Sequence, residues 1–305
     1  MNRTMTALEW ALLIGLSVLW GTSFLFITMA REVPPLTVSA VRVTLAAGAL
    51  LVLLWRQGVR LPRSGSTWWA FAVMALFNDA GPFLLLVLAN PYVPTGLTSV
   101  LVATSPLFTV VLAHLLTDDE RMTGRHVAGA LTGFAGLAVM LGGGSIDFSP
   151  AAIMGQLACL AASLGYAYAS VYGRRFTALR LHPMTTAAGQ LGTSALVLVP
   201  LALLVEHPWT LPSPSWHAAA ALLWLGLLTG ALAYAIFFRI LATAGATNVV
   251  LVTFMSPITA ILLGIVLLGE RLAGQQVAGM ALIGVGIAVL DGRPLRAVLR
   301  RVRAG

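Results

Sequence analysis

Residues 97–142, LTSVLVATSPLFTVVLAHLLTDDERMTGRHVAGALTGFAGLAVMLG, decide the fold because the same pattern returns about 150 residues later. Residues 248–292, NVVLVTFMSPITAILLGIVLLGERLAGQQVAGMALIGVGIAVLDG, repeat its apolar runs, Ser-Pro, Glu-Arg and Val-Ala-Gly in the same order. Between Glu120 and Gly142, ten of 23 positions equal those of the second copy, where about two or three would match by chance. Shared hydrophobicity alone explains neither Ser-Pro nor Glu-Arg. The chain is therefore predicted to consist of two copies of one unit.

The composition indicates that lipid surrounds this chain. Of the 305 residues, 59% are hydrophobic and 9% are charged, whereas an ordinary soluble domain carries about 25% charged residues. A soluble fold of this length cannot bury so much apolar surface. The formal charge of +8 comes from arginines in short loops and a terminal tail, which is typical of topology control and not of a nucleic-acid interface. We expect an all-α polytopic membrane protein that contacts the bilayer and no nucleic acid.

Ten hydrophobic runs are long enough to cross a bilayer, which takes about 20 residues per helix. They cover residues 8–29, 36–56, 68–88, 95–116, 123–142, 151–173, 184–205, 216–238, 246–268 and 272–290. The links between them are short and carry Pro, Gly, Ser or charged residues, as loops do. Each copy holds five runs, an odd number, so the second copy must enter the membrane from the opposite side.

Arginine positions predict the orientation. With a cytoplasmic N-terminus, 15 of the 18 arginines lie inside, Arg31 and Arg271 lie outside, and Arg42 lies within a helix. The positive-inside rule then places both termini in the cytoplasm, with the chain in the inner (plasma) membrane. Two inverted five-helix repeats are the usual construction of an alternating-access transporter, whose substrate site lies near the midplane between the repeats.

The sequence contains no recognised motif that would bind a cofactor or a metal ion or would catalyse a reaction. Cys159 is the single cysteine and lies in an apolar run, and the five histidines show no ligand spacing. All basic residues are arginines, so a phosphate-binding loop with its lysine is absent. Hydrolase motifs such as Gly-x-Ser-x-Gly are also absent. We expect no cofactor, no metal and no enzymatic activity.

Two charges lie inside predicted spans, where each costs about 2.5–3.5 kcal/mol at a helix centre. Arg42 and Asp79 differ in predicted depth by roughly 5 Å, about one helical turn, so a buried pair between them is possible. In a functional interpretation, one or both bind substrate or Asp79 relays protons. In the alternative interpretation, the pair only joins the second and third spans.

A Ser-Pro dipeptide lies in the middle of the fourth and ninth spans, at Ser105-Pro106 and Ser256-Pro257. Proline removes a backbone donor and frees a carbonyl one turn back. Membrane helices tolerate this where the freed group faces protein or a cavity. Pro106 and Pro257 are therefore predicted hinges, and static kinks are the alternative.

Aromatic residues beside glycine occur in matching spans of the two copies, at Trp20-Gly21 in the first and Gly165-Tyr166 in the sixth. Such residues suit a cavity for an apolar or aromatic solute, although they could equally be packing or lipid-facing residues. Gly129-x-x-x-Gly133 and Gly226-x-x-x-Gly230 predict close helix packing.

With these features in hand, the sequence resembles the drug/metabolite transporter superfamily, and within it the EamA-type family. The motifs that carry the resemblance are Trp20-Gly21, residues 41–46 (VRVTLA), residues 77–83 (FNDAGPF), the paired Ser-Pro spans, and Glu120-Arg121 and Glu270-Arg271 with Gly129 and Gly279. The resemblance implies two EamA units, residues 8–142 and 151–291, followed by a basic cytoplasmic tail at 292–305.

The resemblance also implies export of small metabolites, often amino acids, through a central cavity. Carried over residue by residue, the substrate-binding set would be Trp20, Asn78, Asp79, Ser105, Tyr166, Tyr234 and Met255. The small multidrug members of the superfamily use a carboxylate in their first span for proton coupling. Here the corresponding span carries only Glu9, at its cytoplasmic mouth, which leaves either Asp79 as the mid-membrane proton carrier or no proton coupling at all.

The sequence thus predicts a secondary transporter, an exporter of small metabolites such as amino acids. It would act as a monomer by alternating access around a midplane cavity. The alternative is a lipid flippase or scramblase, which needs a groove open to lipid.

Overall fold

In the computed structural model, every regular element among the described residues is helical. The structure describes residues 6–116, 124–141, 149–173, 175–176, 179, 181–244, 252–269, 271 and 274–291. The elements in the first half are α1 (Ala7–Met29), α2 (Pro35–Arg56), α3 (Gly65–Met74), η1 (Ala75–Ala80), α4 (Gly81–Ala89), α5 (Thr95–Val102), α6 (Ser105–Leu116) and α7 (Gly124–Leu141). Those in the second half are α8 (Pro150–Tyr172), α10 (Pro183–Val205), η2 (Pro208–Thr210), α11 (Trp216–Leu223), η3 (Trp224–Leu232), α12 (Ala233–Ala244), α14 (Val252–Leu268) and α15 (Gly274–Asp291).

Seven of the described helical stretches are long and apolar enough, by length and composition, to cross a membrane. They are 7–29, 35–56, 65–89, 95–116, 150–172, 184–205 and 216–237. Shorter apolar helices cover Val127–Gly136, Thr259–Leu268 and Val277–Gly286. The prediction of an all-helical polytopic membrane protein is confirmed at this level. The count of ten spans stays a prediction.

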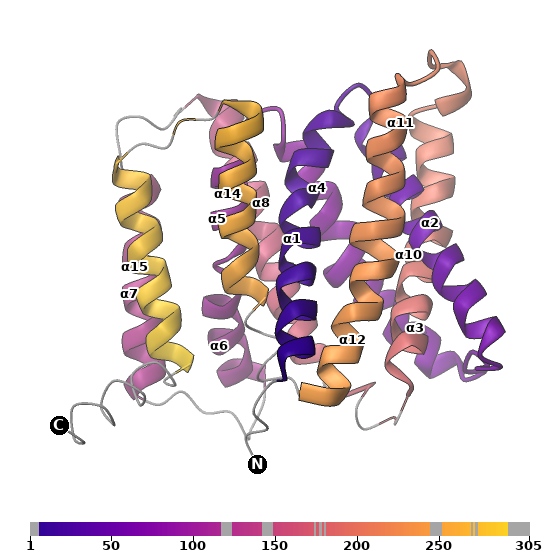
Figure 1. Ribbon diagram of the computed structural model, residues 1–305, viewed down its shortest axis with the longest axis horizontal. Coiled ribbons are helices and arrows are strands. Elements are labelled where there is room, and N and C mark those ends of the chain that lie inside the picture. Colours follow the sequence, from indigo (N-terminus) through magenta and orange to yellow (C-terminus); the bar gives the residue numbers. More distant parts are fainter. Residues whose placement is uncertain are drawn as a thin grey trace.

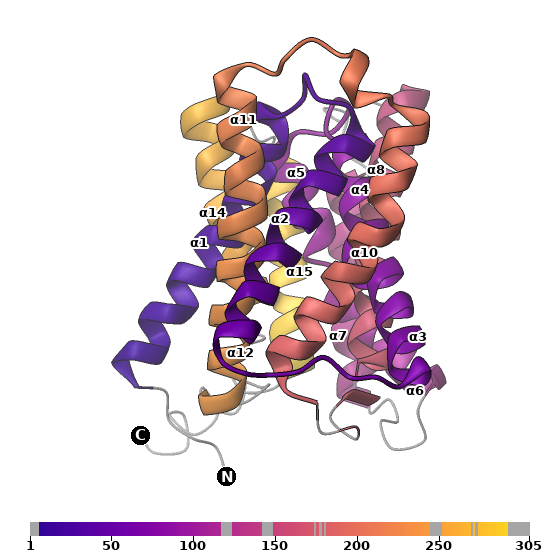
Figure 2. The same cartoon turned by 90° about the vertical axis from the view of Figure 1, so that its right-hand side faces the viewer.

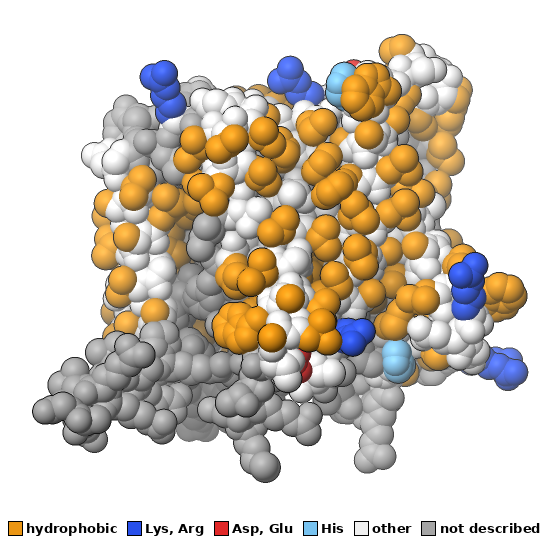
Figure 3. All heavy atoms as spheres, in the orientation of Figure 1, with side chains coloured by type: hydrophobic (Ala, Val, Ile, Leu, Met, Phe, Trp, Pro, Cys, Tyr) orange, Lys and Arg blue, Asp and Glu red, His pale blue; other side chains and the backbone are white. Residues whose placement is uncertain are grey.

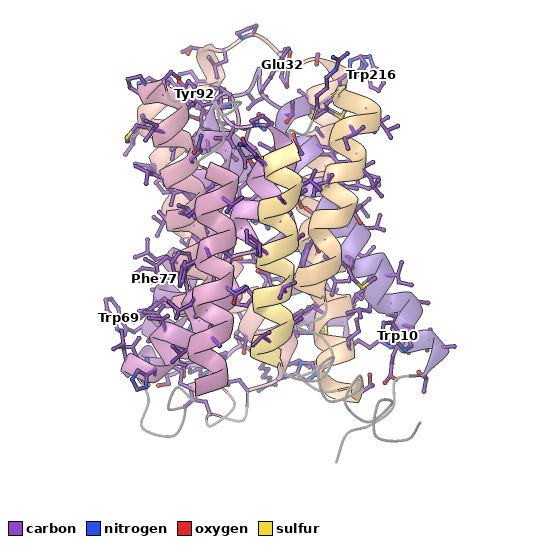
Figure 4. The ribbon with its side chains drawn as sticks, turned by 90° about the vertical axis from the view of Figure 1, so that its left-hand side faces the viewer. Trp10, Glu32, Trp69, Phe77, Tyr92 and Trp216 are labelled. Carbon is purple, nitrogen blue, oxygen red and sulfur yellow. The ribbon has the colours of Figure 1, made fainter. Side chains whose placement is uncertain are left out.

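The outer surface of the helices is apolar, as expected of a protein in lipid. Large hydrophobic side chains cover the sides of the molecule in Figure 3, and the arginines that it shows lie toward the two ends. In Figure 4, Trp10 and Trp69 lie at one end, whereas Tyr92 and Trp216 lie at the other. Aromatic residues gather at the two interfaces of a bilayer, so these two levels are consistent with membrane boundaries.

The helices pack in pairs that join the two halves of the sequence. α2 runs along α10, α1 along α14, and α7 along α15. Figure 1 shows α7 and α15 together at one side of the molecule, and Figure 2 shows α2 beside α10. The first helix begins and the last described helix ends at the same end of the molecule (Figure 1). The core is therefore built from interdigitated halves and not from two separate bundles.

Glycines allow α7 and α15 to approach backbone to backbone. A Cβ at Gly136 would lie 2.7 Å from the Ile283 nitrogen, and one at Gly286 would lie 2.5 Å from the Gly133 nitrogen. Only glycine leaves room for such contacts, which are typical of tightly associated membrane helices. The close packing predicted from Gly129-x-x-x-Gly133 thus has a partner helix, α15.

Two carboxylates connect the halves at the end of the molecule that carries Glu32 in Figure 4. Glu206, which ends α10, accepts hydrogen bonds from the backbone nitrogens of Leu36 and Thr37 at 2.8 and 2.7 Å and so caps α2. Glu32 accepts one from the Ser215 nitrogen at 2.6 Å. Hydrogen bonds from Ser215 hold the pKa of the Glu32 carboxyl below its usual range, which favours the charged form that makes this contact.

We predict that Gly286→Ala destabilises the protein, because the added methyl would lie 2.5 Å from backbone of α7. Overpacking of this kind costs about 1–3 kcal/mol. The matched control is Gly284→Ala, since a Cβ there meets nothing within 4 Å. Thermal unfolding of the purified variants in detergent would measure the difference. Equal melting temperatures for the two variants would contradict the close contact between α7 and α15.

Candidate functional site

Asp79 lies at the centre of a buried polar cluster formed where η1 meets α12. The Tyr234 hydroxyl donates a hydrogen bond to Asp79 Oδ1 at 2.8 Å. Asn78 Nδ2 approaches the same hydroxyl at 3.5 Å. Asp79 is 1% exposed. The cluster joins residues from both halves of the sequence, since 155 positions separate Asp79 from Tyr234.

A π-helical turn, η1, positions Asp79, and Gly81-Pro82 accounts for it. The Gly81 nitrogen donates to the Leu76 carbonyl, five residues back. A Cβ at Gly81 would lie 2.3 Å from that carbonyl oxygen, so the turn requires glycine here. Pro82 has no N–H and cannot continue a regular α-helical pattern. Such π turns are frequent at functional sites.

A second π-helical segment, η3, precedes Tyr234 in the second half. Its glycines rest on α2: a Cβ at Gly226 would lie 2.5 Å from the Leu45 Cβ, and one at Gly230 would lie 2.7 Å from the Ala46 Cβ. Trp224 Nε1 donates to the Thr22 hydroxyl of α1 at 3.0 Å. η3 therefore contacts the first two helices and presents Tyr234 to Asp79.

Arg42 is buried near this cluster but makes no ion pair with Asp79. Its guanidinium carbon lies 4.0 Å from the centroid of the Phe83 ring. Its Nε and Nη1 have no hydrogen-bond partner, and neither does Asp79 Oδ2. The Arg42 charge is nevertheless within electrostatic range of Asp79, Tyr166 and Tyr234. The sequence placed these two charges at similar depth, and the structure buries both without direct contact.

Aromatic side chains stand beside the cluster. Trp20 packs edge-on against Tyr234, with ring centroids 6.3 Å apart, and lies 5.7 Å from the Phe237 ring. Met255 belongs to the same apolar cluster as Trp20. The structure thus brings together Trp20, Asn78, Asp79 and Tyr234. Tyr166 is within electrostatic range of Asp79.

Ser105 lies in a separate polar contact, where the fourth apolar stretch is interrupted. α5 ends at Val102 and α6 begins at Ser105. The hydroxyls of Thr104 and Ser105 lie 3.0 and 2.9 Å from the Ser163 hydroxyl of α8. The helix is therefore interrupted next to Pro106, and hydroxyl contacts connect this point to α8.

The second Ser-Pro dipeptide differs from the first. α14 continues through this position as one helix. The Pro257 side chain is outside the described residues.

Three features have little or no signal in the sequence pattern. The two π segments were not predicted, although Gly81-Pro82 in mid-span is a sign of one. Ser163 was not singled out, because a single serine in an apolar helix is common. Gln190 of α10 is 2% exposed and its Oε1 has no partner. Its neighbour Gly189 packs against the Phe71 ring, and Leu191 belongs to the apolar cluster that also contains Ala80 and contacts Tyr234.

We predict that Tyr234→Phe lowers stability, because it removes the one hydrogen bond that Asp79 Oδ1 accepts. A buried polar group left without its partner costs about 1–3 kcal/mol. The matched control is Tyr92→Phe, whose side chain is 53% exposed. Thermal unfolding in detergent measures both. A melting temperature for Tyr234→Phe as high as that of the control would show that the hydrogen bond is absent.

Comparison with known proteins gives consistent matches. The model of the EamA-like transporter family matches residues 8–142 and 153–290. The chain is 30% identical over 254 residues to the uncharacterized inner membrane transporter YedA of Escherichia coli K12, covering 83% of this chain and 80% of YedA. It is 31% identical over 218 residues to the aromatic amino acid exporter YddG of Ancylobacter novellus, covering 70% of this chain and 74% of YddG. A solved crystal structure superposes with a TM-score of 0.68 at 26% identity, over 97% of this chain and 99% of the other.

Proposed function

Because the chain belongs to the EamA-like transporter family, we propose that it is a secondary transporter that exports small metabolites such as amino acids. The observation that carries the proposal is the similarity to YddG, an aromatic amino acid exporter, over 70% of this chain. The aromatic side chains beside Asp79 are compatible with such a solute. The proposed location is the inner membrane, with both termini in the cytoplasm.

We propose that ten spans form two inverted five-helix repeats, and the packing of the helices supports this. In two equivalent repeats, each contact between a span of the first repeat and one of the second should have a counterpart with the repeats exchanged. The contact of α1 with α14 corresponds in this way to the contact of α8 with α5 and α6, and both contacts occur. Likewise α2 packs on η3 while α10 packs on η1. The π segments η1 and η3 also occupy matching spans. A pseudo-two-fold axis would produce this pattern.

In the proposed mechanism, the solute binds near the midplane, and the protein rocks and its helices bend around it. Among the described residues, the interruptions of the α-helical pattern at η1, at η3 and between α5 and α6 are positions where spans would bend. Trp20, Asn78, Asp79, Tyr166, Tyr234 and Met255 would contact the solute, while Ser105 and Pro106 would act at the bend. Asp79 is the proposed proton carrier, because Glu9 is held in a capping box with Thr6 at the start of α1.

A lipid flippase is the alternative, and one feature of the surface favours it. A groove of about 250 Å³ lies between α2 and α10, lined by Thr37, Ala40, Val41, Thr44, Leu45, Val199, Ala202, Leu203 and Pro208. This lining is almost entirely apolar, so it suits an acyl chain. A lipid headgroup would also need polar groups along its path, and the groove supplies few. Export of a small solute is therefore the better-supported function.

We predict that purified protein in proteoliposomes carries radiolabelled amino acids and does not flip fluorescent lipids. Asp79→Asn should reduce amino-acid flux by about tenfold or more, because it removes the buried carboxylate. The matched control Glu9→Gln makes the same chemical change at a helix end and should retain flux. Lipid flipping without amino-acid flux in the wild-type protein would overturn the proposed function.

A further inference from the structure

Arg42 and Asp79 are buried charged residues, and some of their polar atoms have no hydrogen-bond partner. Arg42 is 8% exposed and Asp79 1%. Among the buried side-chain atoms that the structure describes, only Arg42 Nε and Nη1, Asp79 Oδ2 and Gln190 Oε1 have no hydrogen-bond partner. Buried charges without partners are costly. Three of these four atoms therefore indicate a place where a ligand completes the bonding.

The two charges face one region of the protein. Phe83, over which the guanidinium lies at 4.0 Å, follows Asp79 by one helical turn. Residues four apart on a helix are neighbours on one face. The Tyr234 hydroxyl donates a hydrogen bond to Asp79 Oδ1, so Oδ2 is the carboxylate oxygen that remains available to another partner. The region thus offers a cation with two donors and, within electrostatic range of it, an anion with one acceptor.

We infer that Arg42 and Asp79 are the two ends of a binding site for a dipolar ligand, one that carries a carboxylate and a cationic amine. This inference rests on the proposed function and names the substrate class of that site. Arg42 Nε and Nη1 bind the carboxylate, because the planar guanidinium matches carboxylate geometry bidentately. Asp79 Oδ2 binds the ammonium group. The rings of Trp20 and Tyr234 contact an apolar or aromatic remainder of the ligand.

A purely structural ion pair fits the observations less well. Such a pair is favourable only when its groups are in direct contact and their remaining atoms are hydrogen-bonded. Here the two groups make no ion pair and three of their atoms lack partners. A site for a proton alone would leave the Arg42 guanidinium without a role.

The test compares L-phenylalanine with two analogues that each lack one charge, phenethylamine and 3-phenylpropionate. Binding to the purified full-length protein in detergent is measured by calorimetry. The wild-type protein should bind L-phenylalanine about tenfold or more tightly than either analogue, since each analogue leaves one buried charge unpaired. Arg42→Gln should lose L-phenylalanine affinity by a similar factor while phenethylamine affinity is unchanged. Asp79→Asn should lose L-phenylalanine affinity and leave 3-phenylpropionate unchanged.

The matched control is Arg56→Gln, the same change at the exposed end of α2, which should bind all three compounds as the wild type does. If Arg42→Gln does not yield monodisperse protein, Arg42→Lys keeps the charge but not the planar fork. It should weaken L-phenylalanine binding and spare phenethylamine.

Variants that weaken all three compounds equally, or a wild type that transports amino acids but binds both analogues as tightly as L-phenylalanine, would overturn this inference alone. Absence of any amino-acid flux in the wild type would instead overturn the proposed function.

Discussion

A peptide group inside a bilayer must find its hydrogen-bond partner within the protein, because lipid offers none. This constraint explains why every regular element among the described residues is a helix and why other groups support breaks in the α-helical pattern. At the break between α5 and α6, the hydroxyls of Thr104 and Ser163 approach each other and also donate to the carbonyls of Leu101 and Val102. At η1, the Leu76 carbonyl accepts from Gly81. Specific hydrogen bonds therefore stabilise these interruptions.

The buried polar cluster lies at one of these interruptions. The π turn that ends at Ala80 carries Asn78 and Asp79, and η3 directly precedes Tyr234. A carboxylate in such surroundings needs donors from other helices, and Tyr234 supplies one of them from the opposite half of the chain. The same surroundings leave Asp79 Oδ2 and two nitrogens of Arg42 without partners. The geometry that stabilises one oxygen of the carboxylate thus leaves the other available.

Much of the architecture could be predicted from the sequence, because lipid makes composition and apolar length decisive. The apolar runs, the close approach at Gly226 and Gly230, and the burial of Arg42 and Asp79 all follow from that constraint. The π segments could not be predicted in this way, because a span that is apolar all round shows no periodic pattern that one extra residue per turn would disturb. Side-chain direction was equally out of reach: depth alone suggested that Arg42 meets Asp79, but the guanidinium lies over Phe83 instead. Ser105 was expected beside the solute, and its hydroxyl lies against Ser163, a partner that no spacing rule identifies.

The glycine contact between α7 and α15 has a mechanical consequence. One helix comes from each copy of the repeated unit, and at Gly136 and Gly286 a methyl group would already collide with the opposite backbone. Backbone atoms at this distance cannot move closer, and moving them apart would open a gap that side chains are too far away to fill. Relative motion of α7 and α15 is therefore restricted to rotation about this crossing. This pair of helices would then act as a pivot.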